Sequence, residues 1–246
     1  MAHYTFVGCD AREVVRGRLR MAQKVTAAKN EIQSLLKRFG VERPKGLGKG
    51  WTKGYRAWLD SLADGRGPLG HGAIVVLTSQ LGLLGVYEKE MACFDHHIKA
   101  LAATPRYGSA VASMEVTKGV SVLTAMVVLT ELGDLARFRN RRAVAAYVGL
   151  VPSKHESGEA NDRKGHITRQ GPARVRRVLA QAAWSWTLWD PGAKAAYERL
   201  VARNPKKKIA LVAMMRRLLI RLWHRGLEAQ RPARDARADT PGGSDT

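Results

Sequence analysis

Apolar residues recur at alternating steps of three and four positions over two long stretches of the chain. Such spacing places them on one face of a helix, as in a heptad seam of about four repeats. Arg18 fills one seam position of the first stretch, and Gly40 follows it as a helix terminator. The first seam consists of Ala11, Val14, Met21, Val25, Ala28, Ile32, Leu35 and Phe39. The second consists of Leu77, Leu81, Leu84, Tyr87, Met91, Phe94, Ile98 and Leu101.

These patterns predict two long helices that pair as an antiparallel coiled coil, within one chain or between two chains. Ordinary core packing is the alternative explanation for most seam positions. Residues 41–72 between them are rich in Gly, Pro and Lys, and we interpret them as a connector with one short helix. Coiled coil and connector together span residues 11–104.

The remaining segments differ in character. Residues 4–9, YTFVGC, are typical of a short strand. After Thr104-Pro105, residues 105–226 predict a compact helical domain, and residues 227–246 combine low hydrophobicity with Pro, Gly and Asp, which predicts disorder. Helices are expected at 107–116, 120–132, 140–148, 171–189, 192–203 and 206–225. The predicted fold class is mainly α, with a short N-terminal strand remnant at residues 1–10.

The net charge of the chain indicates that this helical protein binds a polyanion. The 246 residues carry 42 Lys and Arg against 21 Asp and Glu, a net charge of +21. Such a surplus attracts nucleic acid or an acidic membrane surface. No polybasic segment adjoins an anchor, the start is too polar for a signal peptide, and the apolar run 73–86 is too short to span a bilayer. We therefore expect DNA or RNA as partner, no membrane, and a cytoplasmic protein.

The basic residues gather in one part of the chain, between residues 137 and 177. Three carboxylates, Glu156, Glu159 and Asp162, oppose them there. Local density of this kind predicts salt-sensitive binding to DNA or RNA, whereas a solvated charged surface is the alternative. The bases are Arg137, Arg139, Arg141, Arg142, Lys154, Arg163, Lys164, Arg169, Arg174, Arg176 and Arg177.

A glycine turn at residues 118–121 is a second candidate for phosphate binding. Gly119 lies between two predicted helices, an arrangement that can aim backbone N–H groups at a phosphate. The turn resembles a helix-hairpin-helix element, although Ser121 stands where that motif usually has its second glycine. A simple connection between two helices explains the same residues equally well.

Ser157 is the candidate for nucleophilic chemistry. It precedes Gly158 in a stretch, residues 149–177, where small residues alternate with Lys, Arg and His. A serine attacks when one group takes its proton and another stabilises the charge on the phosphate. His155 and His166 are candidates for the first role, and Arg163, Lys164 and Arg169 for the second. A turn serine before glycine is the structural alternative.

The acidic residues do not outline a metal site. Phosphoryl transfer with two Mg²⁺ ions needs several carboxylates that converge. Asp10 ends the predicted strand and is therefore the one candidate ligand, part of an incomplete site. The other acids are expected to form surface ion pairs.

Residues 133–184 carry several motifs in a fixed order that resemble the carboxy-terminal domain of the IS116/IS110/IS902 family of insertion-sequence transposases. They include Phe138, the stretch from Tyr147 to Pro152, Ser157-Gly158, the stretch from Gly165 to Gly171, and Val175-Arg176. The resemblance extends more weakly over about nine-tenths of the chain, from about Ala11 to about Leu222.

This resemblance implies a RuvC-like amino domain with a DEDD set of metal-binding acids, Mg²⁺ as cofactor, and homo-oligomers assembled through the coiled coil. It also implies a structured guide RNA, DNA recombination through a serine–phosphate intermediate, and location on the bacterial nucleoid. By position, Ser157 corresponds to the nucleophile. From charge and place we expect nucleic-acid contacts from Gly119, Arg141, Arg142, Lys154, Arg163, Lys164, Arg169, Arg174, Arg176 and Arg177.

The chain departs from the family pattern near its start. YTFVGCD resembles the first RuvC-like strand, but the sequence then passes directly to the start of the coiled coil, so about a hundred residues are expected to be missing. Two hypotheses follow: a shortened transposase chain, or a non-catalytic nucleic-acid-binding remnant. A third, an unrelated ribosomal-type RNA-binding protein, explains the charge but not the Ser-Gly loop.

Overall fold

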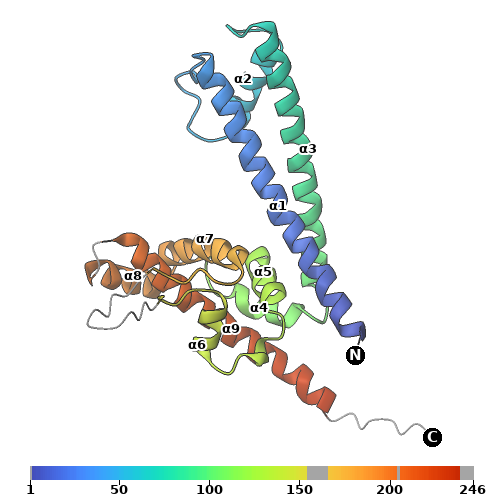
Figure 1. Ribbon diagram of the computed structural model, residues 1–246, viewed down its shortest axis with the longest axis vertical. Helices are drawn as coiled ribbons and strands as arrows, with labels where there is room; N and C mark the ends of the chain where they lie inside the picture. Colours follow the sequence, from blue (N-terminus) through green and yellow to red (C-terminus); the bar gives the residue numbers. More distant parts are fainter. Residues whose placement is uncertain (1, 154–165, 204–205, 239–246) are drawn as a thin grey trace, which may run out of the picture. The chain divides into compact units, whose positions relative to one another are not determined.

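The computed structural model describes residues 2–153, 166–203 and 206–238. Its regular elements there are helices, which confirms the mainly α fold class (Figure 1). In order they are α1 (Ala2–Arg38), α2 (Lys53–Ala63), α3 (His71–Ala102), α4 (Gly108–Glu115), α5 (Val122–Leu132), the 3₁₀ helix η1 (Leu135–Arg137), α6 (Arg141–Tyr147), α7 (Ala173–Trp189), α8 (Pro191–Arg203) and α9 (Lys207–Ala238). Among these described helices, none is long and apolar enough to cross a membrane.

The chain divides into two compact units. One, here called the hairpin unit, comprises residues 16–96; the other, the helical unit, comprises residues 1–15 and 97–246. The boundaries fall inside α1 and α3, so both helices contribute to both units.

In the hairpin unit α1 and α3 run side by side in opposite directions, and α2 packs against both (Figure 1). The seam residues Ile32, Leu77 and Leu84 are almost completely buried in its core. Arg18, the polar residue in the first seam, forms a bidentate ion pair with Asp95 at 2.9 and 3.2 Å. The seams thus pack within one chain, whereas a supercoiled geometry stays a prediction.

Phe39, a predicted seam residue of the hairpin unit, is not in its core. Phe39 is 53% exposed, because α1 ends at Arg38 and the chain leaves the helix there. Val41 takes its place among the partly buried residues that pack against the core. The connector helix α2 occupies the amphipathic stretch of residues 51–62, and Thr52 caps it by accepting a hydrogen bond from the Tyr55 amide at 3.2 Å.

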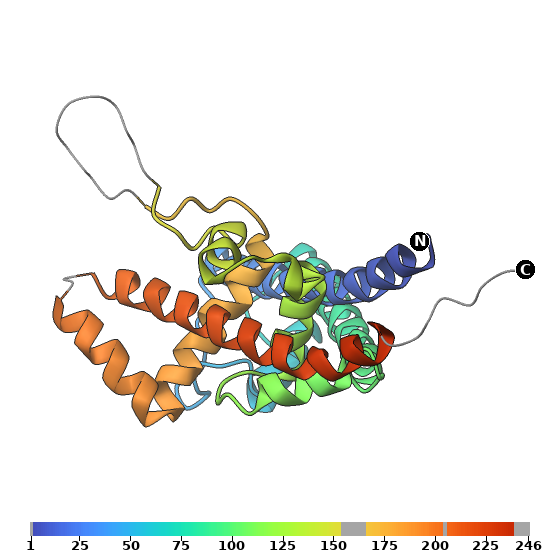
Figure 2. The same ribbon diagram turned by 90° about the horizontal axis from the view of Figure 1, so that it is seen from below.

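The helical unit is built around α9, which runs across it and packs against α4, α5, α6, α7, α8 and η1 (Figure 2). Helix α5 is mostly apolar, and its residues 124–132, which include Thr124, Thr130 and Glu131, are buried, as expected for a central helix. The buried indole of Trp223 on α9 donates to the Leu135 carbonyl at 2.9 Å, which ties α9 to η1.

Two predictions about the chain ends are wrong. Residues 4–9 belong to helix α1 and not to a strand; the segment continues the helix that follows it, and an isolated strand has no ladder partner to satisfy its backbone. Helix α9 continues to Ala238, so residues 227–238 are helical and not disordered. Low hydrophobicity suggested disorder, but the Ala, Arg and Glu content there favours helix.

Candidate functional site

The two segments that flank residues 154–165 lie against each other as an antiparallel stem. Pro152 and Ile167 form a β-bridge. The Ser153 amide donates to the His166 carbonyl at 2.8 Å, and the Thr168 amide donates to the Val151 carbonyl at 2.9 Å. The stem thus starts directly after α6 and returns directly before α7. Ser157, the predicted nucleophile, lies in the intervening segment, together with Lys154, Arg163 and Lys164; all four are outside the described residues.

Two glycines allow the stem to close. Gly149 and Gly171 adopt positive φ angles of 72° and 89°. A Cβ atom at Gly149 would overlap the Gln170 carbonyl oxygen, and one at Gly171 would overlap the Tyr147 carbonyl oxygen. Only glycine meets both requirements, the left-handed backbone and the close approach. These glycines therefore fix where the loop leaves and rejoins the helical unit.

Arg176, on the first turn of α7, joins the two sides of the stem. Its Nη1 donates to the carbonyls of Val148 at 3.0 Å, Gly171 at 3.1 Å and Gln170 at 3.4 Å. One acceptor precedes the loop and two follow it, so a single guanidinium holds both ends. A phosphate contact by Arg176 through its remaining nitrogens stays a prediction.

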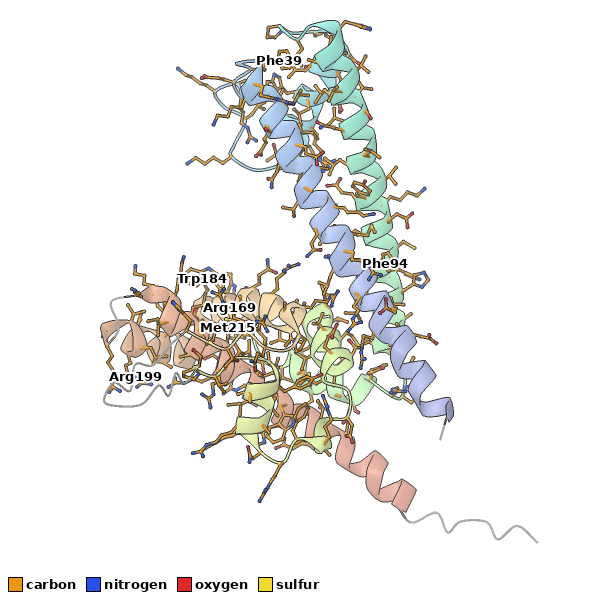
Figure 3. The ribbon with its side chains drawn as sticks, in the orientation of Figure 1. Phe39, Phe94, Arg169, Trp184, Arg199 and Met215 are labelled. Atoms are coloured by element: carbon orange, nitrogen blue, oxygen red, sulfur yellow. The ribbon has the colours of Figure 1, made fainter. Side chains whose placement is uncertain are left out.

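Arg169, labelled in Figure 3, adds a second positive charge that acts on Arg176. It is exposed and has a φ of 56°, a left-handed backbone conformation that few residues other than glycine adopt. Burial lowers the pKa of Arg176, and the charge of Arg169 lowers it further. Two guanidinium groups that repel each other at the base of a loop favour an anion between or beside them.

Further bases stand at the N-terminal ends of helices. Arg141 and Arg142 are exposed on the first turn of α6, and Arg174 lies half-buried near the start of α7. Helix N-termini carry partial positive charge and normally attract carboxylates, yet the first turns of α6 and α7 contain none. Cations at these ends oppose the helix dipole and reduce stability slightly. Together with the dipole they create a field suited to phosphates.

Arg177, also on α7, is exposed. The same region of sequence holds most of the net charge of the chain. Residues 137–225 contain 21 Lys and Arg against 5 Asp and Glu, so this stretch has a net charge of +16 out of +21.

Gly119 has a packing role that sequence alone did not reveal. Its φ is 84°, and a Cβ atom there would lie 2.7 Å from the Trp186 amide nitrogen on α7. Ser121, two residues later, caps α5 by accepting a hydrogen bond from the Thr124 amide at 3.4 Å. Close packing against α7 therefore accounts for this glycine, and phosphate binding by the turn stays a prediction.

Asp10 lies exposed on helix α1. In the part of the chain that the structure describes, no three His, Cys, Asp or Glu side chains gather where they could hold a metal ion. A lone exposed carboxylate does not fit the several oxygen ligands that Mg²⁺ takes from protein and substrate. The Mg²⁺ requirement therefore stays a prediction.

Sequence reasoning missed three exposed apolar side chains, two of them aromatic, near the end of α7. Trp184 is 48% exposed, Leu188 59% and Trp189 70%. The available signal for Trp184 and Leu188 was helical spacing, because these two positions fall outside the stripe of Val175, Leu179, Ala182 and Trp186 that packs into the core. Trp189 continues that stripe but is the last residue of α7.

Comparison with known proteins shows which family this part of the chain resembles. Residues 112–198, which include α5 to α7 and the stem, match the model of the transposase IS116/IS110/IS902 family. The chain is 27% identical over 89% of its length to a putative transposase, y4qE, of Sinorhizobium fredii, of which it covers 57%. It is 28% identical over 85% of its length to the transposase for insertion sequence element IS1111A of Coxiella burnetii, of which it covers 52%.

A third relative is the pilin gene-inverting protein of Moraxella bovis, 27% identical over 51% of this chain and 39% of that protein. The chain spans about half the length of the first two relatives. The family predicted from the motifs at residues 133–184 is confirmed. The chain carries, over residues 112–198, a transposase domain of the IS116/IS110/IS902 family.

Proposed function

We propose that this chain acts in transposition of an insertion sequence, by binding DNA and recombining its strands through Ser157. The observation that carries the proposal is the clasped stem, because Arg176 joins the two segments that flank, in sequence, the stretch containing Ser157, and Arg169 adds a second positive charge there. The names of the relatives support transposition, and inversion of a pilin gene is also a DNA rearrangement.

The chemical step transfers a phosphodiester without any net oxidation or reduction. The Ser157 Oγ attacks a DNA phosphorus and forms a serine–phosphate ester, while one bond between phosphorus and a deoxyribose oxygen breaks. The leaving deoxyribose hydroxyl takes up a proton, and the serine loses one. Arginine side chains near the loop stabilise the extra charge on the phosphate oxygens during this exchange. Reversal with a second DNA end as the acceptor completes a strand exchange.

We propose that the protein works as an oligomer of identical chains together with a structured RNA. Helix α3 supports the first part, because Val75, Val76, Leu83 and Val86 are exposed on the side away from the buried Leu77 and Leu84. Pairing with a second copy would remove this apolar stripe from water. The size of the oligomer would be measured by light scattering, and Leu83→Lys is expected to reduce it.

A trapping experiment tests the proposed chemistry. The purified chain is incubated with insertion-sequence end DNA, the element's RNA and Mg²⁺, then denatured, and covalent protein–DNA adducts are separated by electrophoresis. We expect an adduct that Ser157→Ala abolishes and that Ser109→Ala, which removes an exposed serine on α4, leaves intact.

The alternative function, a non-catalytic nucleic-acid-binding chain, gives the opposite result in the same experiment. Salt-sensitive DNA binding would persist, but no adduct would form in the presence of Mg²⁺ and RNA. The concentration of positive charge in residues 137–225 favours binding in either case. The adduct alone distinguishes the two functions.

A further inference from the structure

Helix α7 has an exposed face that the stem and its arginines do not use. Its buried stripe faces α5 and α9 in the helical unit. Arg177, Gln181, Trp184 and Leu188 are exposed and follow one another at steps of four, three and four, so they share the opposite face. This face ends at the corner between α7 and α8.

Trp184 is held in place while part of its ring stays open. Its indole meets the Tyr197 ring of α8 edge to face, with centroids 6.1 Å apart and planes at 87°. Such a contact orients the indole without covering it, and 48% of Trp184 remains exposed (Figure 3). Trp184 is therefore a pre-positioned flat surface and not a loosely attached side chain.

The corner that brings Tyr197 to Trp184 is defined locally. Asp190 Oδ1 accepts a hydrogen bond from the Ala193 amide at 2.8 Å, which caps α8, and Pro191 occupies the first helical position. The Ala193 N–H is the main cause that lowers the pKa of Asp190. The carboxylate is thus committed to the cap, and its position fixes the start of the helix that carries Tyr197.

The charge around this indole selects an anionic partner. Residues 173–225, which form α7, α8 and most of α9, contain 13 Lys and Arg against 2 Asp and Glu. Lys194 is exposed and lies three residues before Tyr197, on the same side of α8. Arg177 lies two turns before Trp184 on the same face of α7, about 10 Å along the helix axis. This positively charged surface would repel a basic protein partner, whereas it attracts the phosphates of a nucleic acid.

We infer that Trp184 is a stacking site for an unpaired nucleotide base, with the basic residues of α7 and α8 along the adjoining phosphates. An exposed aromatic ring in a positively charged surface is how proteins hold single strands without reading their sequence. In a duplex the bases are already stacked on each other, so the open face of Trp184 distinguishes unpaired from paired nucleic acid. The inference rests on the proposed nucleic-acid function and adds the substrate form, a single-stranded segment.

The test compares three fluorescent probes by anisotropy at one salt concentration: a short oligothymidylate, the same backbone with abasic sites, and a duplex of similar charge. Trp184→Ala is expected to weaken binding of the oligothymidylate about tenfold and to leave the abasic strand and the duplex unchanged. Trp184→Tyr, which keeps an aromatic face, is expected to restore most of the lost affinity. Equal losses on all three probes, or no loss on any, would overturn the inference.

A matched variant separates this explanation from an apolar protein contact. Leu188→Ala removes an exposed apolar side chain one turn further along the same face, and we expect it to leave binding of all three probes unchanged. If a protein partner covered this face, both variants would weaken self-association and neither would affect the oligothymidylate. All measurements are made in a Ser157→Ala background, so that stacking is scored even if no serine adduct ever forms.

Discussion

Several arginines and lysines of the hairpin unit pair with carboxylates, whereas several arginines of the helical unit are held by backbone carbonyls, as Arg43 of the hairpin unit also is. In the hairpin unit Arg18 pairs with Asp95, and both Lys29 and Arg56 pair with Glu88. In the helical unit Arg137, Arg176 and Arg225 donate to the backbone carbonyls of Leu132, Val148 and Ser113. A carboxylate cancels the charge of its partner, whereas a carbonyl orients a guanidinium and leaves its full charge in place.

The difference shows how a folded domain can order its cations and still present them to a polyanion. Aromatic contacts act in the same way as carbonyls. The Arg137 guanidinium lies over the rings of Phe138 and Tyr147, at 4.4 and 4.5 Å from their centroids, and Arg221 lies over Trp186 at 4.9 Å. These contacts hold the groups in place without neutralising them. The comparison predicts that the helical unit dominates DNA binding and that the hairpin unit is sensitive to loss of its carboxylates.

The largest expected effect concerns the salt dependence of DNA binding. If six or more phosphates are neutralised, affinity for duplex DNA should fall about a thousandfold or more between 50 and 200 mM salt. Arg141→Gln with Arg142→Gln should reduce the slope of log affinity against log salt by up to about 2. The matched pair Lys37→Gln with Arg38→Gln, exposed at the end of α1 in the hairpin unit, should change it less. Equal changes of the slope in the two double variants would contradict the prediction that the helical unit dominates DNA binding.

The second prediction concerns the closure of the stem. Gly171→Ala places a methyl group on the Tyr147 carbonyl at a φ of 89°, so we expect it to destabilise the protein by about 3 kcal/mol or more, or to open the stem. Gly70→Ala, in the hairpin unit, meets open space and should be close to neutral. Urea unfolding measures both. A stable Gly171→Ala variant with an unchanged midpoint would show that the stem does not close as described.

The third prediction concerns the clasp. Arg176→Met keeps much of the side-chain volume but removes the donor to three carbonyls, which should cost about 1–3 kcal/mol. It should also abolish the Ser157 adduct, because the two ends of the loop are then no longer held together. Arg225→Met, which removes a donor to the Ser113 carbonyl on α4, serves as the control and should retain the adduct. If Arg176→Lys restored the adduct, the positive charge at this position, and not the bonds to the three carbonyls, would explain the role of Arg176.

The sequence predicted the helices better than it predicted the contacts that matter for function. The seam residues Ile32, Leu77 and Leu84 could be placed because the spacing of apolar residues reports burial directly. The hydrogen bonds of Arg176 could not be predicted, because their acceptors are backbone carbonyls, which every residue type has. Trp184 was overlooked for a related reason: a tryptophan in a helical pattern is normally assigned to the core, and only the register of α7 places it outside.

The strand predicted at residues 4–9 failed because a short run of residues that favour strands is also compatible with the first turns of a helix. The excess of Lys and Arg could be counted from the sequence, but the partner of each side chain could not be predicted from it. Whether an arginine pairs with a carboxylate or with a carbonyl depends on tertiary structure.

The smallest expected effect concerns Glu88, where the hairpin unit concentrates its pairing. Burial raises the pKa of Glu88, but hydrogen bonds from Arg56 and Lys29 outweigh it, so the pKa is lower than its ordinary value of 4.5. A carboxylate with a lowered folded-state pKa stabilises the protein above its unfolded-state pKa, and this stabilisation is lost as the pH falls below 4.5 through the folded value. The side chains of this network are 25–37% exposed, so we expect Glu88→Gln to cost about 1 kcal/mol or less at neutral pH. Stability curves of Glu88→Gln and the unmodified chain should converge in acid. Glu90→Gln, two residues along α3 on its exposed side, is the control, and a similar loss there would mean that general charge balance, and not pairing at Glu88, stabilises the hairpin unit.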